Sequence, residues 1–176
     1  ILEQFELAHI WNQDKKSGKW TMTDKLQASV PPEILFIERC TQFLKEKGRM
    51  AIVLPDAILG SPGLGYIREW LILNHRIVAS IDLHVDTFQP RNGTQTSVLV
   101  LEKKSREQKD KEAKSGEMAD YNIFMSMVEK VGHDRRGNPL FKRDADGNEI
   151  LVPEMTDSEE SGSQQKMIKI EDDQTY

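Results

Sequence analysis

Three side chains of metal-binding type occupy alternate positions near the middle of the chain: Asp82, His84 and Asp86. Alternate residues of a strand point to the same face, so these three side chains could converge on one ion. The other histidines are scattered along the sequence and lack the spacing to Asp or Glu that a metal site requires. We therefore predict no metal site in this chain.

A second candidate lies at the end of an apolar run. Residues 50–54 form a continuous hydrophobic stretch typical of a parallel strand, and Asp56 follows it closely. Because α/β sheets bind ligands at the carboxyl ends of their strands, Asp56 could line the rim of a pocket. We favour the simpler interpretation that it caps the next turn. Thr96 and Ser97, which begin a later strand, could face the same rim, but we favour a structural role in the strand.

Basic residues gather in one place, at Arg135, Arg136, Lys142 and Arg143. They could contact phosphates or an acidic partner, but a solvated surface is the simpler interpretation. The whole chain has 24 Lys and Arg against 29 Asp and Glu, giving a net charge of −5. A domain that binds DNA by itself usually carries a basic face. Either DNA is not the partner, or other parts of a larger assembly supply most phosphate contacts.

The composition limits the remaining classes of protein. Cys40 is the single cysteine, so no disulfide within the chain and no cysteine-based metal site is possible. No apolar run approaches the roughly 18 residues of a membrane-spanning helix. The sequence begins at Ile1 without the features of a signal peptide, so we treat it as part of a longer protein. We expect a cytoplasmic location, in a bacterium or archaeon.

The apolar patterns in the middle of the chain predict an α/β fold. Helical periodicity covers residues 33–47, ended by Gly48, and a second helix covers residues 64–74. Strands are predicted at 50–54, 77–83 and 96–101. The first two strands are joined through a helix and should be parallel, with a right-handed crossover. The last two are too close for a helical crossover, so we expect an antiparallel hairpin at the edge of the sheet.

The flanking sequence divides into simpler segments. A lead-in over residues 1–30 holds a short helix at 1–9 and a loop or loose hairpin at 11–20. Residues 105–120 have no apolar period and predict a charged linker. Residues 121–155 predict a strand at 121–128 and a small hairpin formed by 139–143 and 149–152. We expect an acidic mobile tail over 156–176 and find no internal repeat.

Five segments within residues 31–104 and one later motif carry a resemblance to a known family. They are PEILFIERC at 32–40, GRMAIVLPD at 48–56, YIREWL at 66–71, DTFQP at 86–90, TQTSVL at 94–99 and GHDRRG at 132–137. Together they resemble the methylation subunit of type I restriction-modification systems, in the N6-adenine DNA methyltransferase family. The resemblance implies the C-terminal half of a Rossmann-like, S-adenosylmethionine-dependent methyltransferase sheet over residues 31–104. This half comprises a parallel strand, a crossover helix and a closing antiparallel hairpin, here followed by a small β-hairpin extension.

The family's catalytic and donor-binding motifs do not match this sequence. The family binds S-adenosylmethionine with a glycine-rich turn after its first strand, and no such turn occurs early in this chain. Its catalytic loop has Asp or Asn, two prolines and an aromatic residue, whereas the prolines here, Pro31 and Pro32, stand between Val30 and Glu33. We interpret them as the start of a helix. We therefore expect no catalytic, cofactor-binding or metal-binding residues here, and no cofactor bound by the chain alone.

One substrate-binding loop does match the family. In the wider adenine-methylase family, an aromatic residue between the last two strands holds the extruded base, and Phe88 matches that position, followed by Gln89 and Pro90. The alternative is a loop phenylalanine that packs back on the sheet. We predict Phe88, Gln89 and Pro90 as the adenine-binding residues, with Asp56, Thr96 and Ser97 as weaker candidates for the pocket rim.

The resemblance implies a parent enzyme that methylates adenine N6 in duplex DNA, with S-adenosylmethionine as donor. A separate specificity subunit would read the sequence, a motor-nuclease subunit would cleave, and this chain alone would be inactive. No membrane association is expected. The main alternative is a non-catalytic α/β scaffold whose residues 121–152 dock partner subunits. A third possibility is a methyltransferase that acts on a small molecule or a protein.

Overall fold

A computed structural model describes residues 2–153 and 167–173 of the chain. The chain divides into two compact units. The first comprises residues 1–82 and 96–126, and the second comprises Leu83–Gln95 with Met127–Tyr176. The predicted α/β core belongs to the first unit. In the described residues, no helix is long and apolar enough to cross a membrane.

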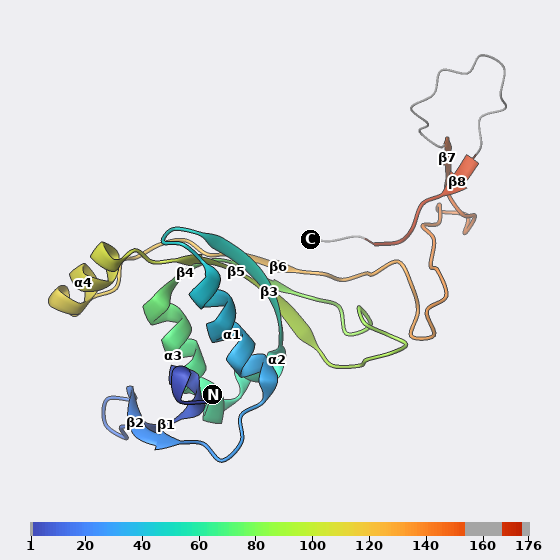
Figure 1. The fold of residues 1–176 in the computed structure, drawn as a ribbon. Coiled ribbons are helices and arrows are strands. Elements are labelled where there is room, and N and C mark those ends of the chain that lie inside the picture. The colour runs from blue at the N-terminus through green and yellow to red at the C-terminus, as the bar shows by residue number, and fades with distance from the viewer. Residues whose placement is uncertain (1, 154–166, 174–176) are drawn as a thin grey trace. The chain divides into compact units, whose positions relative to one another are not determined.

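The first unit is built on a mixed four-stranded sheet (Figure 1). Its strands lie in the order β3 (Arg49–Pro55), β5 (Thr96–Lys103), β4 (His75–Asp82) and β6 (Phe124–Met127). β5 is antiparallel to both β3 and β4, so those two strands are parallel to one another. The predicted antiparallel pairing of the last two core strands is confirmed. The hairpin is not at the edge, because β5 pairs with β3 along its other side.

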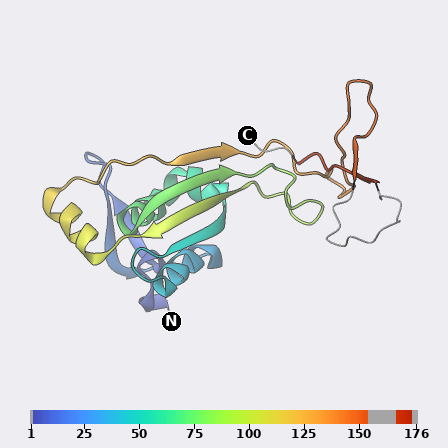
Figure 2. The same cartoon turned by 90° about the horizontal axis from the view of Figure 1, so that it is seen from above.

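The helices α1 (Pro32–Phe43) and α3 (Gly65–Asn74) lie on the same face of the sheet (Figures 1 and 2). A short helix, α2 (Asp56–Gly60), follows β3 directly. The buried apolar cluster lies between the helices and the sheet and includes Ile37, Ile67 and Leu101, all fully buried. The burial of β3 alternates along the strand, and Val53 is 48% exposed. A continuous apolar run such as residues 50–54 is typical of a strand covered on both faces, but β3 is covered on one face only.

A contact with a residue far away in the sequence determines where α1 ends. The helix was predicted to reach residue 47, but it ends at Phe43, where Leu44 turns to an extended conformation. The terminal carbonyl groups of Thr41 and Leu44 both accept hydrogen bonds at 2.8 Å from Nζ of Lys103, which lies on β5. This interaction satisfies groups that a helix terminus leaves unpaired. Gly48 is consequently not the residue that ends the helix.

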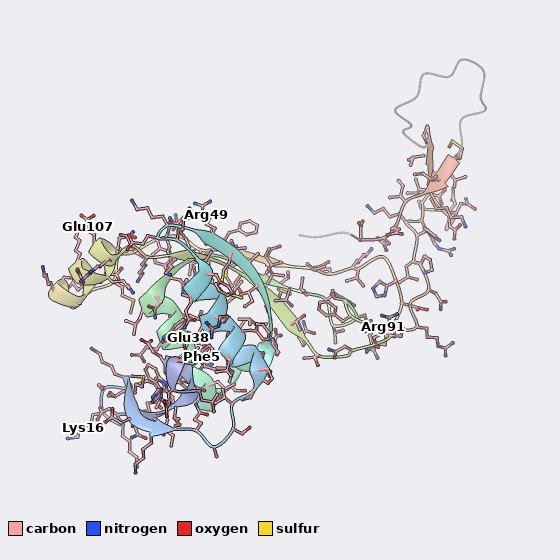
Figure 3. The ribbon with its side chains drawn as sticks, viewed as in Figure 1. Phe5, Lys16, Glu38, Arg49, Arg91 and Glu107 are labelled. Carbon is pink, nitrogen blue, oxygen red and sulfur yellow. The ribbon has the colours of Figure 1, made fainter. Side chains whose placement is uncertain are left out.

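The N-terminal segment packs against α1. In place of the predicted helix at 1–9, it forms two 3₁₀ turns, η1 (Leu2–Gln4) and η2 (Glu6–Ala8). A hairpin of β1 (His9–Gln13) and β2 (Trp20–Leu26) follows, which confirms the predicted hairpin around residues 11–20. Glu38 of α1 lies close to Phe5 (Figure 3), and its carboxylate accepts the Glu6 and Leu7 amides at 3.0 and 2.9 Å. Burial raises the pKa of Glu38, while the two backbone hydrogen bonds oppose that rise.

The predicted charged linker contains a helix, α4 (Arg106–Ser115). A capping box formed by Ser105 and Gln108 starts it, and Gly116 ends it with a left-handed backbone. No residue of α4 is buried, so the helix has no apolar face for a periodicity to reveal. Before its first turn, Lys104 is 4% exposed and pairs with Glu112 of α4 at 2.6 Å. The predicted charged linker is therefore helical over Arg106–Ser115, an element that the prediction did not include.

The second unit contains a small sheet of β7 (Leu151–Pro153) and β8 (Met167–Lys169). The predicted pairing of 139–143 with 149–152 is present only as an isolated bridge between Arg143 and Glu149. Part of the predicted tail, residues 167–169, is strand β8, so that part of the prediction is wrong. Residues 154–166 and 174–176 lie outside the described residues.

Candidate functional site

Asp56 and Ser97 join two strand ends in the first unit. Ser97 Oγ donates a 2.8 Å hydrogen bond to Asp56 Oδ1, which links the start of α2 to the start of β5. Asp56 is the first residue of α2 and makes no side-chain capping bond, so the favoured capping interpretation is wrong. The Asp56 carboxylate instead fixes the carboxyl end of β3 against β5.

Thr96 precedes Ser97 and is also buried, with 7% of its surface exposed. Its hydroxyl oxygen is buried without a hydrogen-bond partner among the described residues. Buried hydroxyl groups usually find a partner, because leaving one unpaired costs roughly 1–3 kcal/mol. Of the three residues predicted for the pocket rim, Thr96 is therefore the one whose buried hydroxyl could still accept or donate a hydrogen bond.

The loop that carries Phe88 belongs to the second unit. It is a series of tight turns, in which the Gln89 amide donates to the Asp86 carbonyl at 3.0 Å and the Asn92 amide donates to the Phe88 carbonyl at 2.9 Å. The Phe88 side chain is 41% exposed. An exposed aromatic ring on a loop fixed by its own hydrogen bonds is available for stacking.

Gln89 and Pro90 line a cavity of about 350 Å³ within the second unit. Gly132, His133 and Glu171 also line it. A cavity of this size suits a small ligand. Gln89 offers a donor and an acceptor, His133 an imidazole and Glu171 a carboxylate, so the lining can meet a planar polar ligand with several hydrogen bonds. His133 and Glu171 were absent from the predicted site.

An ion pair links the Phe88 loop to the C-terminal extension that contains Arg135. Arg135 Nε lies 3.1 Å from Asp86 Oδ1, and the Asp86 side chain is only 14% exposed. His84 Nδ1 accepts the Asp86 amide at 3.1 Å. The described residues contain no cluster of three metal-binding side chains. Arg135, predicted as part of a basic surface, is thus engaged within the unit.

Arg143 also has partners within the second unit, so a second member of the predicted basic cluster is already bonded. Its Nη1 donates to the Gly147 carbonyl at 2.9 Å, and its Nη2 lies 3.9 Å from Glu149. An arginine with an internal acidic partner is a weaker candidate for a phosphate contact than a free one.

His75 has an imidazole that could exchange a proton, but it does not line the cavity described above. It is fully buried at the start of β4, and burial lowers its pKa to about 4. Its Nε2 lies 3.0 Å from the Thr41 hydroxyl, and its Nδ1–H donates to the Leu71 carbonyl at 3.2 Å. We assign it to the core.

The sequence model of the N-6 DNA methylase family matches residues 4–171, which include both strand ends and the Phe88 loop. The chain belongs to the N-6 DNA methylase family. In this family member, the Phe88 loop and the motif at 132–137 belong to one compact unit. No curated protein matches the sequence.

Two solved structures resemble this N-6 DNA methylase. A putative class I S-adenosylmethionine-dependent methyltransferase from Listeria monocytogenes is 18% identical, with a TM-score of 0.45. The alignment covers 72% of this chain and 31% of that protein. A modification subunit of a putative type I restriction enzyme from Vibrio vulnificus YJ016 is 25% identical, with a TM-score of 0.38. Here the alignment covers 40% of this chain and 16% of that protein, so the chain spans under a third of either structure.

Proposed function

We propose that this chain is part of an enzyme that transfers a methyl group from S-adenosylmethionine to N6 of adenine in DNA, within a type I restriction-modification system. The observation that carries the proposal is the exposed Phe88 ring, next to Gln89 and Pro90 at a cavity. Membership of the N-6 DNA methylase family supports the chemistry.

On this proposal, the chain supplies part of the site for the flipped base. An enzyme that modifies a base inside a duplex must extrude it and hold it against aromatic or apolar faces. Phe88 provides such a face, and the Gln89 amide can hydrogen-bond to a base edge. Phe88 and Gln89 orient the adenine, and orientation is a large part of catalysis for two bound reactants.

We assign no donor-binding residues to this chain. A donor site of the expected kind needs a glycine-rich turn that lets backbone approach the ligand closely. Gly65, the first residue of α3, does permit a close approach, but by a protein group: a Cβ there would lie 2.8 Å from Trp20 Nε1. We therefore infer that S-adenosylmethionine binds elsewhere in the complete protein. The isolated chain should neither bind the donor nor methylate DNA, and methyl transfer by the isolated chain would contradict this.

Duplex DNA, a specificity subunit and a motor-nuclease subunit are the partners that this proposal requires. The net charge of −5 fits a chain that leaves most phosphate contacts to other parts of such an assembly.

The test is Phe88→Ala in the complete protein with its partner subunits, compared with Phe43→Ala, which removes a ring that is 79% exposed on α1. Loss of base–aromatic stacking costs roughly 1–3 kcal/mol, so Phe88→Ala should lower kcat/KM for methylation by about 5- to 150-fold. The fluorescence of 2-aminopurine at the target position, which reports unstacking, should fall as well. Phe43→Ala should match the wild type in both assays.

Unchanged methylation and 2-aminopurine fluorescence in Phe88→Ala would refute the role of Phe88 in base binding. If replacement of residues 121–152 then disrupted subunit assembly, the chain would be a docking scaffold rather than part of the catalytic pocket.

A further inference from the structure

Two turns of the same architecture lie ten residues apart in the second unit. In the first turn, Asp134 Oδ1 accepts the Arg136 and Asn138 amides at 2.8 and 2.9 Å. In the second turn, Asp144 plays the same part toward residues 146 and 148, at 3.0 and 2.8 Å. Hydrogen bonds from the Asn138 side chain and from the Asn138 amide lower the pKa of Asp134, and the hydrogen bond from the Asn148 amide lowers the pKa of Asp144. The pattern Asp-x-x-Gly-Asn occurs twice in the sequence, at 134–138 and 144–148, so the prediction of no internal repeat is wrong for this short motif.

Both turns require a glycine at the fourth position. Gly137 has φ +83° and Gly147 has φ +88°, a left-handed region that disfavours residues with a Cβ. Around Gly147 there is open space, with nothing within 4 Å of a Cβ built there. At Gly137, a Cβ would lie 3.2 Å from Cδ of Pro90. The first turn therefore lies against the Phe88 loop, and its glycine allows that approach.

The second position of each turn differs in charge. The first turn has Arg135, whose Nε lies 3.1 Å from Asp86 Oδ1, and the second turn has Ala145 at the equivalent place. Asp86 is two residues before Phe88, and its carbonyl accepts the Gln89 amide that closes the turn around Phe88. An ion pair on Asp86 therefore restrains the backbone that carries the Phe88 ring.

We propose that the 134–138 turn is a positioning element for the Phe88-Gln89-Pro90 loop. Arg135 holds the start of the loop through Asp86, and Gly137 lets the turn support Pro90. An isolated loop must lose conformational entropy each time it binds a base, and external restraints reduce that loss. The catalytic consequence rests on the proposed function, whereas the restraint of the loop does not.

The restraint is tested by hydrogen exchange of the loop amides in the complete protein. Arg135→Gln should speed the exchange of residues 86–92 by about threefold or more, since a partly buried ion pair contributes up to about a factor of five. Arg136→Gln removes the same charge from the same turn and should leave that exchange unchanged. Gly137→Ala should speed it as well. Gly147→Ala, which has the same backbone strain without the Pro90 contact, should not.

The catalytic consequence is tested by combining the variants. Because small misplacements reduce rates strongly, Arg135→Gln should lower kcat for methylation roughly tenfold, with little change in KM for DNA. In a Phe88→Ala background it should have no further effect, since Arg135 acts through Phe88. Thermal unfolding of each variant monitors the fold.

The outcomes separate the two ideas. If Phe88→Ala leaves methylation unchanged, the proposed role of Phe88 in base binding fails, and loop exchange alone decides the positioning role. If Phe88→Ala lowers methylation while Arg135→Gln equals Arg136→Gln in exchange and in kcat, the positioning role is overturned.

Discussion

The stability of the first unit should fall in acid because of a single buried histidine. His75 is fully buried, and burial lowers its pKa from 6.5 to about 4, with the nearby Lys103, Lys109 and Lys104 acting in the same direction. Below pH 6.5 the unfolded chain binds a proton at this imidazole, and the folded chain does not until about pH 4. The free energy of unfolding therefore decreases as the pH falls through this window.

The size of the effect follows from the width of the window. The span from 6.5 to about 4, at about 1.4 kcal/mol per pH unit, corresponds to about 3 kcal/mol. That is a large part of the 5–15 kcal/mol or so that stabilises a typical domain. Glu38 works in the opposite direction, because its pKa is raised and protonation favours its folded state. Comparison with a variant cancels this second contribution.

The assay is urea unfolding of wild type and His75→Gln at pH 7.0 and 4.5, followed by circular dichroism. Between these pH values the wild type should lose about 2–3 kcal/mol more than His75→Gln. His9→Gln, which changes a partly exposed histidine on β1, serves as the control and should behave as the wild type. Parallel pH profiles for wild type and His75→Gln would show that His75 titrates normally and would refute the reasoning.

Two further predictions concern buried polar groups. Glu112→Ala removes the carboxylate partner of Lys104, which is 4% exposed, and leaves its ammonium group with the Ile72 carbonyl. The substitution should lower the free energy of unfolding in urea by about 2–4 kcal/mol. Glu107→Ala, on the same helix (Figure 3), should change it by under about 0.5 kcal/mol. Equal effects of the two substitutions would disprove the buried pair. Thr96→Val removes a buried hydroxyl that has no partner in the described residues. The free energy of unfolding should therefore stay constant or rise by up to about 1 kcal/mol, and the melting temperature should not fall. A clear loss of stability would mean that the hydroxyl has a partner in solution.

Local signals in the sequence predicted much of the core. The antiparallel pairing of β4 and β5 follows from a connection too short for a crossover helix, and α3 was confirmed from its apolar period. The predictions were wrong where contacts with residues distant in the sequence determine the local structure. The end of α1 depends on Lys103, about 60 residues away, and Asp56 bonds Ser97 rather than capping its own helix.

The candidate site was predictable only in part for the same reason. Phe88, Gln89 and Pro90 are contiguous, so one segment was enough to propose them. Glu171 lines the same cavity but lies in a segment whose composition predicted a tail. α4 is a different case, because its signal was local: the capping residues Ser105 and Gln108 are visible in the sequence, and only the apolar period is absent.

The position of β5 between two parallel strands has a consequence for synthesis on the ribosome. β3 and β4 leave the ribosome first, yet they do not pair with each other, because β5 lies between them. Until β5 has emerged, the nascent chain contains α1 and α3 but lacks Leu99 and Leu101, the β5 residues of the buried apolar cluster. Pairings of such wide sequence separation slow folding and prolong the exposure of apolar surface. Cotranslational protection by a chaperone should matter most while residues 56–103 are being made.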